Sequence, residues 1–402
     1  MSMNTTRRKG LFMNKKSLLI LAFSFNLFAV SASASEVSEM WKRIYQRSIH
    51  LDQKLAVMQN LVEQDDPNLV PTLMEALSNL ILESKNVRSA TDKENWIQLC
   101  RLIINALGTY KATEAAPLLY QCFEATDNPV LKSEALTVLG KIRGTDFTER
   151  ITLLLRNLNL NPGENAVSSE IIAYGCINAL EKLKGNAAYK QVFFASQGWY
   201  SKRVKDRAFQ AIQVMSDDPT DVLAEIIRES EPEIKVQALN AGIASNAPVE
   251  KKVALAVQAL EQGLYEQTID VRAQAQYGAL RSAAIAALID LRSNSLASIE
   301  PLRLAIERNY DINERLNAVL ALGINGTDEA TRVLTVFLDQ QNQRQASGTH
   351  EPDSRFTIAL IRALGMTKNP LARPVLQAVE FSNYTPALIR ISKEALQQID
   401  QR

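Results

Sequence analysis

Apolar residues recur at a helical period along most of the chain. In residues 128–142 they fall on one stripe of a helix: Val130, Leu131, Ala135, Val138, Leu139 and Ile142. A second amphipathic stretch at 113–125 precedes this one, and only Thr126 and Asp127 separate the two. Because a lone helix of this length is marginal in water, the pattern predicts a helical hairpin that is stabilised by its neighbours.

The same hairpin pattern returns many times. Residues 103–108, 135–140, 318–323 and 359–365 all end in Leu-Gly. Predicted helix pairs include 220–229 with 231–244, 299–308 with 312–324, 328–339 with 354–366, and 370–381 with 386–399. A supersecondary unit repeated at roughly 30–45 residues indicates a solenoid. The sequence therefore predicts an all-α superhelix of about ten antiparallel hairpins over residues 35–402, with no room for a separate catalytic domain.

Capping residues mark several helix starts. Asp127, Asp311 and Asp353 each precede a predicted helix, where a side-chain oxygen accepts from free backbone N–H groups. Pro129 and Pro232 stand in a first turn, where the missing N–H costs little. Gly140 is expected to permit close approach of a neighbouring helix.

The second helix of the unit carries a basic residue followed by small residues and Ala-Leu-Gly. The basic residues are Lys132, Lys235, Arg272, Arg315 and Arg355. In this phrase the chain resembles the HEAT-repeat family, in particular its short bacterial repeats, over roughly residues 50–400. Armadillo and tetratricopeptide arrays are the nearest alternatives. The markers of a tetratricopeptide repeat are missing, and spacings near 32 leave no room for a third armadillo helix.

The spacing of equivalent positions is uneven. The gaps along Leu107, Leu139, Leu180, Ile212, Gly242, Leu288, Leu322, Leu364 and Leu396 range from 30 to 46 residues. Polar insertions at 83–94, 157–168 and 340–352 are expected as loops between helices, either tolerated surface loops or a binding rim. The helix over 268–292 is expected to be overlong.

The first 34 residues have the composition of a bacterial secretory signal peptide. A short basic region follows Met13, residues 18–30 are almost uninterrupted apolar positions, and the sequence Ala-Ser-Ala ends at Ala34. Met13 is an alternative start, and Arg7-Arg8 leaves a twin-arginine signal as a second alternative. Cleavage near Ala34 predicts a periplasmic or secreted protein.

Charge and composition narrow the classes of partner. Removal of the five basic leader residues changes the formal net charge from +1 to −4, which disfavours nucleic acid. No later stretch is apolar enough to span a bilayer, and no cysteine follows the leader to carry a lipid.

Catalytic motifs are missing from the sequence. The histidines, His50 and His350, lie far apart, and no zinc, phosphate-loop or nucleophile-elbow motif is present. Some HEAT-like proteins are iron hydroxylases with repeated His-Glu pairs, but this chain has one such pair, at His350. Others are phycobilin lyases, which have no short motif to test. We expect no enzyme activity, no cofactor and no metal.

Three cysteines fall within apolar stripes. Cys100, Cys122 and Cys176 are expected as buried, inert thiols. Cys100 and Cys122 lie at equal distances on either side of the turn near Lys111. An antiparallel hairpin would place them face to face, so a disulfide in an oxidising compartment is the alternative.

Aromatic and basic residues are densest at 198–207. Trp199, Tyr200, Lys202, Arg203 and Lys205 form a candidate partner-binding cluster. The alternative is a helix start whose Trp packs on the next repeat while the cations remain solvated.

These features predict a non-enzymatic, exported scaffold. Its stacked second helices would present a concave face to a protein or peptide of the cell envelope. Two alternatives stay open: an enzyme or cofactor-maturation factor on a HEAT-like scaffold, and a structural component of an envelope machine.

Overall fold

The computed structural model describes residues 37–266, 268–349 and 353–401, and this part of the chain is helical without strands. The predicted signal peptide, residues 1–34, lies outside the described residues. No helix among those described is long and apolar enough to cross a bilayer. The predicted all-α class is thus confirmed.

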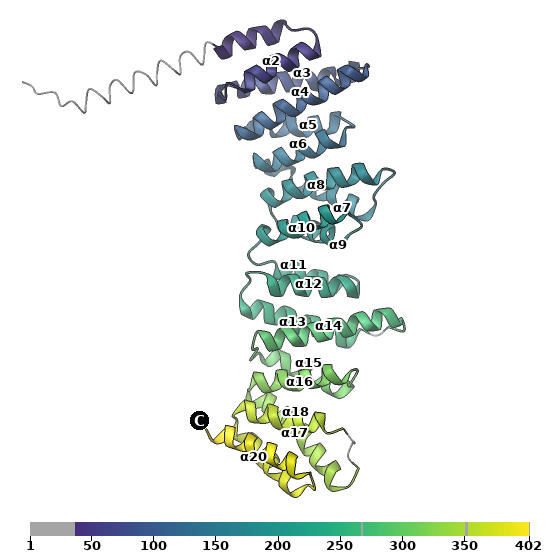
Figure 1. Cartoon of the computed structure of the whole chain (residues 1–402), viewed down its shortest axis with the longest axis vertical. Coiled ribbons are helices and arrows are strands. Elements are labelled where there is room, and N and C mark those ends of the chain that lie inside the picture. Colours follow the sequence, from purple (N-terminus) through teal and green to yellow (C-terminus); the bar gives the residue numbers. More distant parts are fainter. Residues whose placement is uncertain (1–36, 267, 350–352, 402) are drawn as a thin grey trace, which may run out of the picture. The chain divides into compact units, whose positions relative to one another are not determined.

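Residues 37–47 form the first helix. The helices that follow are α2 (Leu51–Val62), α3 (Val70–Glu83), α4 (Ala90–Thr109), α5 (Ala116–Ala125), α6 (Pro129–Lys141), α7 (Thr148–Leu160), α8 (Ala166–Leu183), α9 (Asn186–Gln197), α10 (Lys202–Met215), α11 (Thr220–Glu229), α12 (Pro232–Ala244), α13 (Val249–Tyr265), α14 (Val271–Asp290), α15 (Ile299–Arg308), α16 (Ile312–Asn325), α17 (Asp328–Ala346), α18 (Arg355–Thr367), α19 (Arg373–Ala378) and α20 (Pro386–Asp400) (Figure 1). Short 3-10 helices precede α3, α5, α7, α15 and α19.

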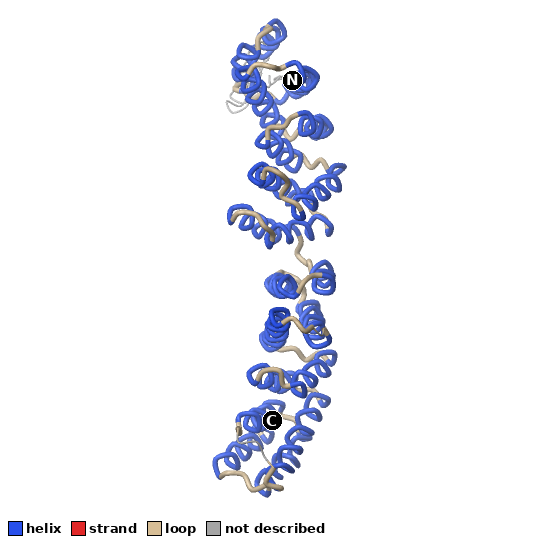
Figure 2. The backbone as a smooth tube through the Cα atoms, turned by 90° about the vertical axis from the view of Figure 1, so that its right-hand side faces the viewer, coloured by secondary structure: helices blue, strands red, loops and turns tan. Residues whose placement is uncertain are grey.

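Within the described ranges these helices pair as ten hairpins, which agrees with the predicted number. The chain divides into two compact units. Unit 1 holds residues up to 184 and residues 191–211, and unit 2 holds residues 185–190 and 212–402. In each unit the second helices pack in one layer and the first helices in another, as the paired columns of Figure 2 show. Each unit is therefore an α-solenoid.

Glycines set the closest helix approach in unit 1. A Cβ on Gly140 would lie 2.5 Å from Ala179 Cα, and one on Gly175 would lie 2.6 Å from Ser133 Cα. Real Cβ atoms do not approach backbone this closely, so α6 and α8 reach their separation only because both positions lack a side chain. The expectation for Gly140 is confirmed.

The predicted capping residue is confirmed at Asp311 and is wrong at Asp127. The Asp311 carboxylate accepts from the N–H groups of Asn313 and Glu314. At α6 the cap is Asn128, whose side chain accepts from Leu131 N–H, and not Asp127. At α18 the N-cap residue is Ser354, while Asp353 accepts from Arg355 N–H.

The described residues of the three polar insertions are mostly helix and not loop, and residues 350–352 lie outside the described part of the chain. Helix α4 begins at Ala90, the segment between α7 and α8 is confined to 161–165, and α17 continues to Ala346. The reason is visible in α17, where Asn342 is buried and donates to Val375 O at 3.1 Å. Amide side chains that hydrogen-bond to the next repeat let a polar sequence continue a helix. Helix α14 is long, as predicted.

Candidate functional site

A groove of about 440 Å3 opens on the second-helix layer of unit 1. It is lined from α4, α6, α8 and α10, and its walls include Asn105, Ser133, Thr137, Tyr174 and Asn178. The close approach of α6 to α8 brings their polar positions together on its floor. A second cavity of about 400 Å3 between α2 and α4 shares Asn105 with it.

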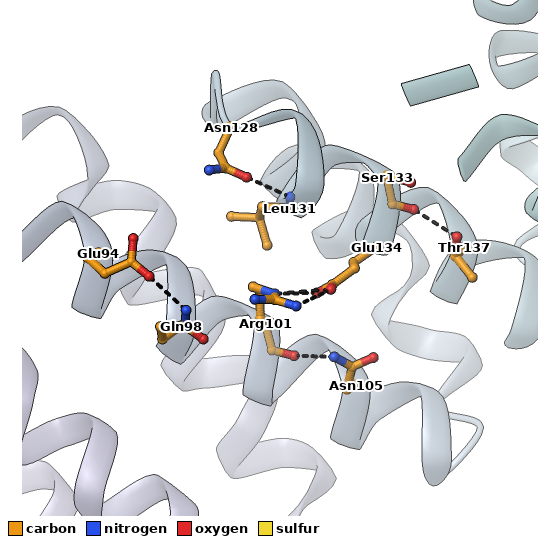
Figure 3. Close-up of polar contacts among 9 residues, drawn as sticks. All are labelled: Glu94, Gln98, Arg101, Asn105, Asn128, Leu131, Ser133, Glu134 and Thr137. Carbon is orange, nitrogen blue, oxygen red and sulfur yellow. Dashed lines mark hydrogen bonds and ion pairs between the residues drawn. The ribbon is translucent and has the colours of Figure 1, made fainter. Parts of the chain in front are cut away.

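One wall of the groove is fixed by an ion pair between consecutive second helices. The Arg101 guanidinium of α4 binds the Glu134 carboxylate of α6 through Nε, at 2.9 and 3.0 Å, and Nη2, at 2.6 Å (Figure 3). The two side chains are 35% and 24% exposed. On the same helices, Asn105 donates to Arg101 O and Thr137 donates to Ser133 O. This bidentate geometry fixes Glu134 in the groove wall and Arg101 in the adjoining cavity.

The opposite wall joins α8 to α10. Asn178 Nδ2 donates to Thr137 Oγ1 at 3.4 Å, and its Oδ1 accepts from Arg207 Nε at 2.7 Å. Arg207 also forms an ion pair with Glu181. Burial alone would raise the pKa of Glu181, but hydrogen bonds from Lys182 and Arg207 outweigh it, and the net pKa lies below its ordinary value.

The predicted aromatic-basic cluster divides between packing and the groove. Trp199 Nε1 donates to Leu158 O at 2.9 Å, and Tyr200, which is 3% exposed, donates to Asn159 Oδ1 at 2.9 Å. These two aromatic rings, 4.3 Å apart, fasten the start of α10 to α7. The aromatic pair therefore has the packing role that was the alternative interpretation.

The cations of that cluster take separate positions. Arg203 lines the groove together with Ser201, and its guanidinium lies 5.1 Å from the centre of the Tyr174 ring. Lys202 is exposed at the helix start, and Lys205 is half-buried one turn into α10. Among the five residues, Arg203 is the one that lines this groove.

A row of cations in the second helices lies against aromatic rings. Lys132 lies 5.2 Å from the centre of Phe123, Lys235 5.9 Å from Tyr277, Arg281 4.2 Å from Tyr310, and Arg315 3.5 Å from Phe356. Each cation lies seven residues before its repeat marker. Arg272 and Arg355 were wrong assignments to this position, because both lie at helix starts and are exposed. The α14 cation is Arg281.

Arg281 forms the buried ion pair of unit 2. Its Nε donates to Glu314 Oε1 at 2.7 Å, its Nη1 donates to Gly263 O at 3.0 Å, and the two charged side chains are 8% and 2% exposed. A Cβ on Gly263 would lie 2.5 Å from Arg281 Cγ, so the glycine makes room for the arginine. Burial raises the pKa of Glu314 above its ordinary value, although Arg281 acts in the opposite direction.

The three cysteines are free, buried thiols in the structure. Burial, and then the hydrogen bond with Cys122, raises the pKa of Cys100 well above its ordinary value. Burial also raises the pKa of Cys176. The contact places Cys100 and Cys122 face to face, as the hairpin register predicts. The disulfide between them stays a prediction.

No group of three or more His, Cys, Asp or Glu side chains is placed to hold a metal ion in the part of the chain that the structure describes. His50 is exposed at the start of α2, where its side chain makes no capping hydrogen bond. His350 lies outside the described residues.

Sequence reasoning missed most of the groove. Glu134, Tyr174 and Asn178 of the groove, and Arg101 of the adjoining cavity, were not predicted as site residues, although the sequence carries a signal. The position two residues before each repeat marker holds an amide or hydroxyl residue in α4, α6, α8 and α10, and in α2 Gln59 stands two residues before the buried Leu61. These residues are Gln59, Asn105, Thr137, Asn178 and Gln210, here called the amide row.

Comparison with known proteins does not assign this chain to a family. No family model matches the chain, and no curated protein matches it. Among solved structures, an engineered protein is 14% identical, with 90% of this chain and 99% of that chain covered and a TM-score of 0.36. A circular tandem repeat protein is 16% identical over 93% of this chain and 89% of that one, with a TM-score of 0.18. The description of this chain as a helical repeat protein of the α-solenoid class rests on its own stacked hairpins.

Proposed function

We propose that this protein is an exported, non-enzymatic HEAT-like scaffold that binds a protein of the cell envelope in the groove of unit 1. The observation that carries the proposal is the groove itself, an open cavity of about 440 Å3 bordered by fixed polar and charged side chains. Solenoids bind partners through the surfaces of stacked helices of this kind. The HEAT resemblance and the leader composition support the family and the compartment.

In-cell photocrosslinking tests the location of binding. A photoreactive phenylalanine analogue replaces Val130, which is 39% exposed and lines the groove, or Leu153, which is 47% exposed on α7 in the layer of first helices. We expect a discrete adduct from position 130 that is missing from position 153. Equal adducts from both positions, or none from position 130, would contradict the proposal.

Two further measurements test the compartment and the lack of activity. N-terminal sequencing of the mature protein should begin at Ser35, and a chain that retains Met1 or Met13 would overturn export. Elemental analysis and an absorption spectrum of the purified protein should show no stoichiometric metal or chromophore. Stoichiometric iron or a bound pigment would favour an enzyme or maturation factor.

A further inference from the structure

The amide row identifies the chemistry that the groove can bind. Asn105, Thr137 and Asn178 line the groove, and Gln59 lines the adjoining cavity. In unit 2 the equivalent positions hold Asn240, Ala286, Leu320, Arg362 and Glu394. A run of amide and hydroxyl side chains is therefore a property of unit 1.

The hydrogen-bonding capacity of the row is only partly used within the protein. Asn105 Nδ2 donates to Arg101 O at 2.9 Å, and its Oδ1 accepts no hydrogen bond from the described residues. Asn178 uses its Oδ1 for Arg207 and one N–H for Thr137. A side-chain amide has two N–H donors and a carbonyl with two lone pairs, so each residue retains capacity for a ligand.

The spacing of the row suits an extended polypeptide. Packed helices lie about 8–10 Å apart, and an extended chain advances about 3.3 Å per residue. One amide is thus available for about every three residues of a chain that crosses α4, α6 and α8. An extended segment needs both donors and acceptors for its backbone, which side-chain amides supply.

The charges of the groove favour an acidic residue in that segment. Glu134 is occupied by Arg101, and Glu170 accepts the Ser201 N–H at the start of α10. Lys141 and Arg203 also line the groove, and neither forms an ion pair with another described residue. The Arg203 guanidinium on the Tyr174 ring presents a planar set of N–H donors that suits a carboxylate.

The same charges disfavour a polyanion. The wall holds two carboxylates and two cations that line the groove, so a nucleic-acid backbone would meet as much repulsion as attraction. A single carboxylate beside a neutral backbone fits the arrangement better.

We propose that the groove of unit 1 binds an extended peptide segment, whose backbone pairs with the amide row and whose acidic side chain binds Arg203. This inference rests on the proposed function and names the class of ligand for the same groove.

Fluorescence anisotropy with the full mature chain tests the acidic residue. The probes are three pools of labelled 12-residue synthetic peptides of mixed sequence, each with Glu, Gln or Lys fixed at the centre. We expect the Glu pool to bind about 10-fold more tightly than the Lys pool, which corresponds to one charge contact. Arg203→Glu should reverse this order. Equal binding of the pools, or an unchanged order in the variant, overturns the acidic preference.

Asn105→Ala and Asn178→Ala test the amide row. Each should weaken all three pools about 3-fold to 10-fold, because backbone pairing does not depend on the peptide side chain. Asn157→Ala on α7 is the matched control, since Asn157 is exposed and lies outside the groove. Circular dichroism checks that each variant folds. Unchanged binding in both asparagine variants overturns the pairing.

The two proposals fail in different ways. If no pool binds at concentrations up to about 1 mM while the in-cell adduct from position 130 persists, the groove holds a folded partner, and the extended-peptide inference is wrong. If the adduct is also missing, the groove is not a binding site, and the proposed function fails with it.

Discussion

Two ion pairs, one in each unit, join consecutive second helices with the same residue types and the same separation of 33 residues. Arg101 binds Glu134 in unit 1, and Arg281 binds Glu314 in unit 2. The unit 1 pair is 35% and 24% exposed at the edge of a groove, whereas the unit 2 pair is 8% and 2% exposed. An arginine-glutamate pair between consecutive second helices is thus part-exposed at a groove in one unit and buried in the core of the other, according to what covers it.

Two identified groups cover the Arg281 guanidinium in unit 2. In unit 2 the Tyr310 ring lies 4.2 Å from the Arg281 guanidinium, and Gly263 O accepts one of its N–H groups. In unit 1 the Arg101 guanidinium remains in contact with water, so the ion pair with Glu134 contributes little to the free energy of unfolding. Charges removed from water depend on their partner for most of their stabilisation.

The largest expected effect on stability comes from replacing the arginine of each ion pair with alanine. Arg281→Ala should destabilise unit 2 by about 3–5 kcal/mol, because it leaves the buried Glu314 carboxylate without its cation. Arg101→Ala should cost less than about 1 kcal/mol, as exposed pairs do. Urea unfolding with hydrogen exchange at α14, α16, α4 and α6 measures both. Equal losses in the two variants would contradict the comparison.

A smaller effect on stability is expected when a glycine at a helix contact is replaced with alanine. Gly175→Ala should destabilise unit 1 by about 1–3 kcal/mol, since its Cβ would lie 2.6 Å from Ser133 backbone. Gly278→Ala in α14 is the control, because its Cβ would meet nothing closer than 3.6 Å. The free energy of unfolding of this control variant should rise by up to about 1 kcal/mol, because alanine has the higher helix propensity. Thermal unfolding separates the two, and a stabilised Gly175→Ala would show that α6 and α8 are not tightly packed.

The smallest expected effect is an opposite pH dependence of two glutamates. The pKa of Glu181 is lowered in the folded state, so its stabilisation is present above the ordinary pKa of about 4.3 and is lost as pH falls through the folded value. The pKa of Glu314 is raised, so the folded state binds the proton more tightly, and stability falls as pH rises from about 4.3 through the folded value.

Glutamine variants measure these two dependences. The unfolding free energy of the wild type minus that of Glu181→Gln should increase with pH across this window. The unfolding free energy of the wild type minus that of Glu314→Gln should decrease across the same window. Denaturant titrations from pH 3.5 to 7 give both curves. The same sign in both would show that the two environments do not differ as described.

Helix identity was the part most open to prediction. Helices α11 and α15 begin and end at the predicted residues, and Asp311 caps α16 as expected. Local sequence signals are enough to predict these helices, because the apolar period and the capping residue lie within one segment of the chain. The insertion at 340–352 was predicted as a loop because its polar composition does not show that Asn342 bonds to Val375 O, 33 residues further on.

The candidate site was less open to prediction for the same reason. The cluster at 198–207 stood out by composition, yet Trp199 and Tyr200 hydrogen-bond to α7, 41 residues earlier, and Arg203 alone of the five lines the groove. Arg272 was predicted at the position that Arg281 holds, because both are basic residues in one long helix. The spacing of seven residues before Leu288 distinguishes Arg281 in the sequence, and the packing of α16 shows that its charge is buried against Glu314.

The sequence by itself determined that this protein is an array of helical hairpins, since a period of 3.6 with small residues at fixed positions leaves stacking as the way to bury each apolar stripe. The tertiary structure decided which polar positions become surface and which become core. Each second helix is covered by side chains from the next repeat, 30 or more residues away. The physical environment of Arg101 or Arg281 is therefore set by neighbours that no local pattern contains.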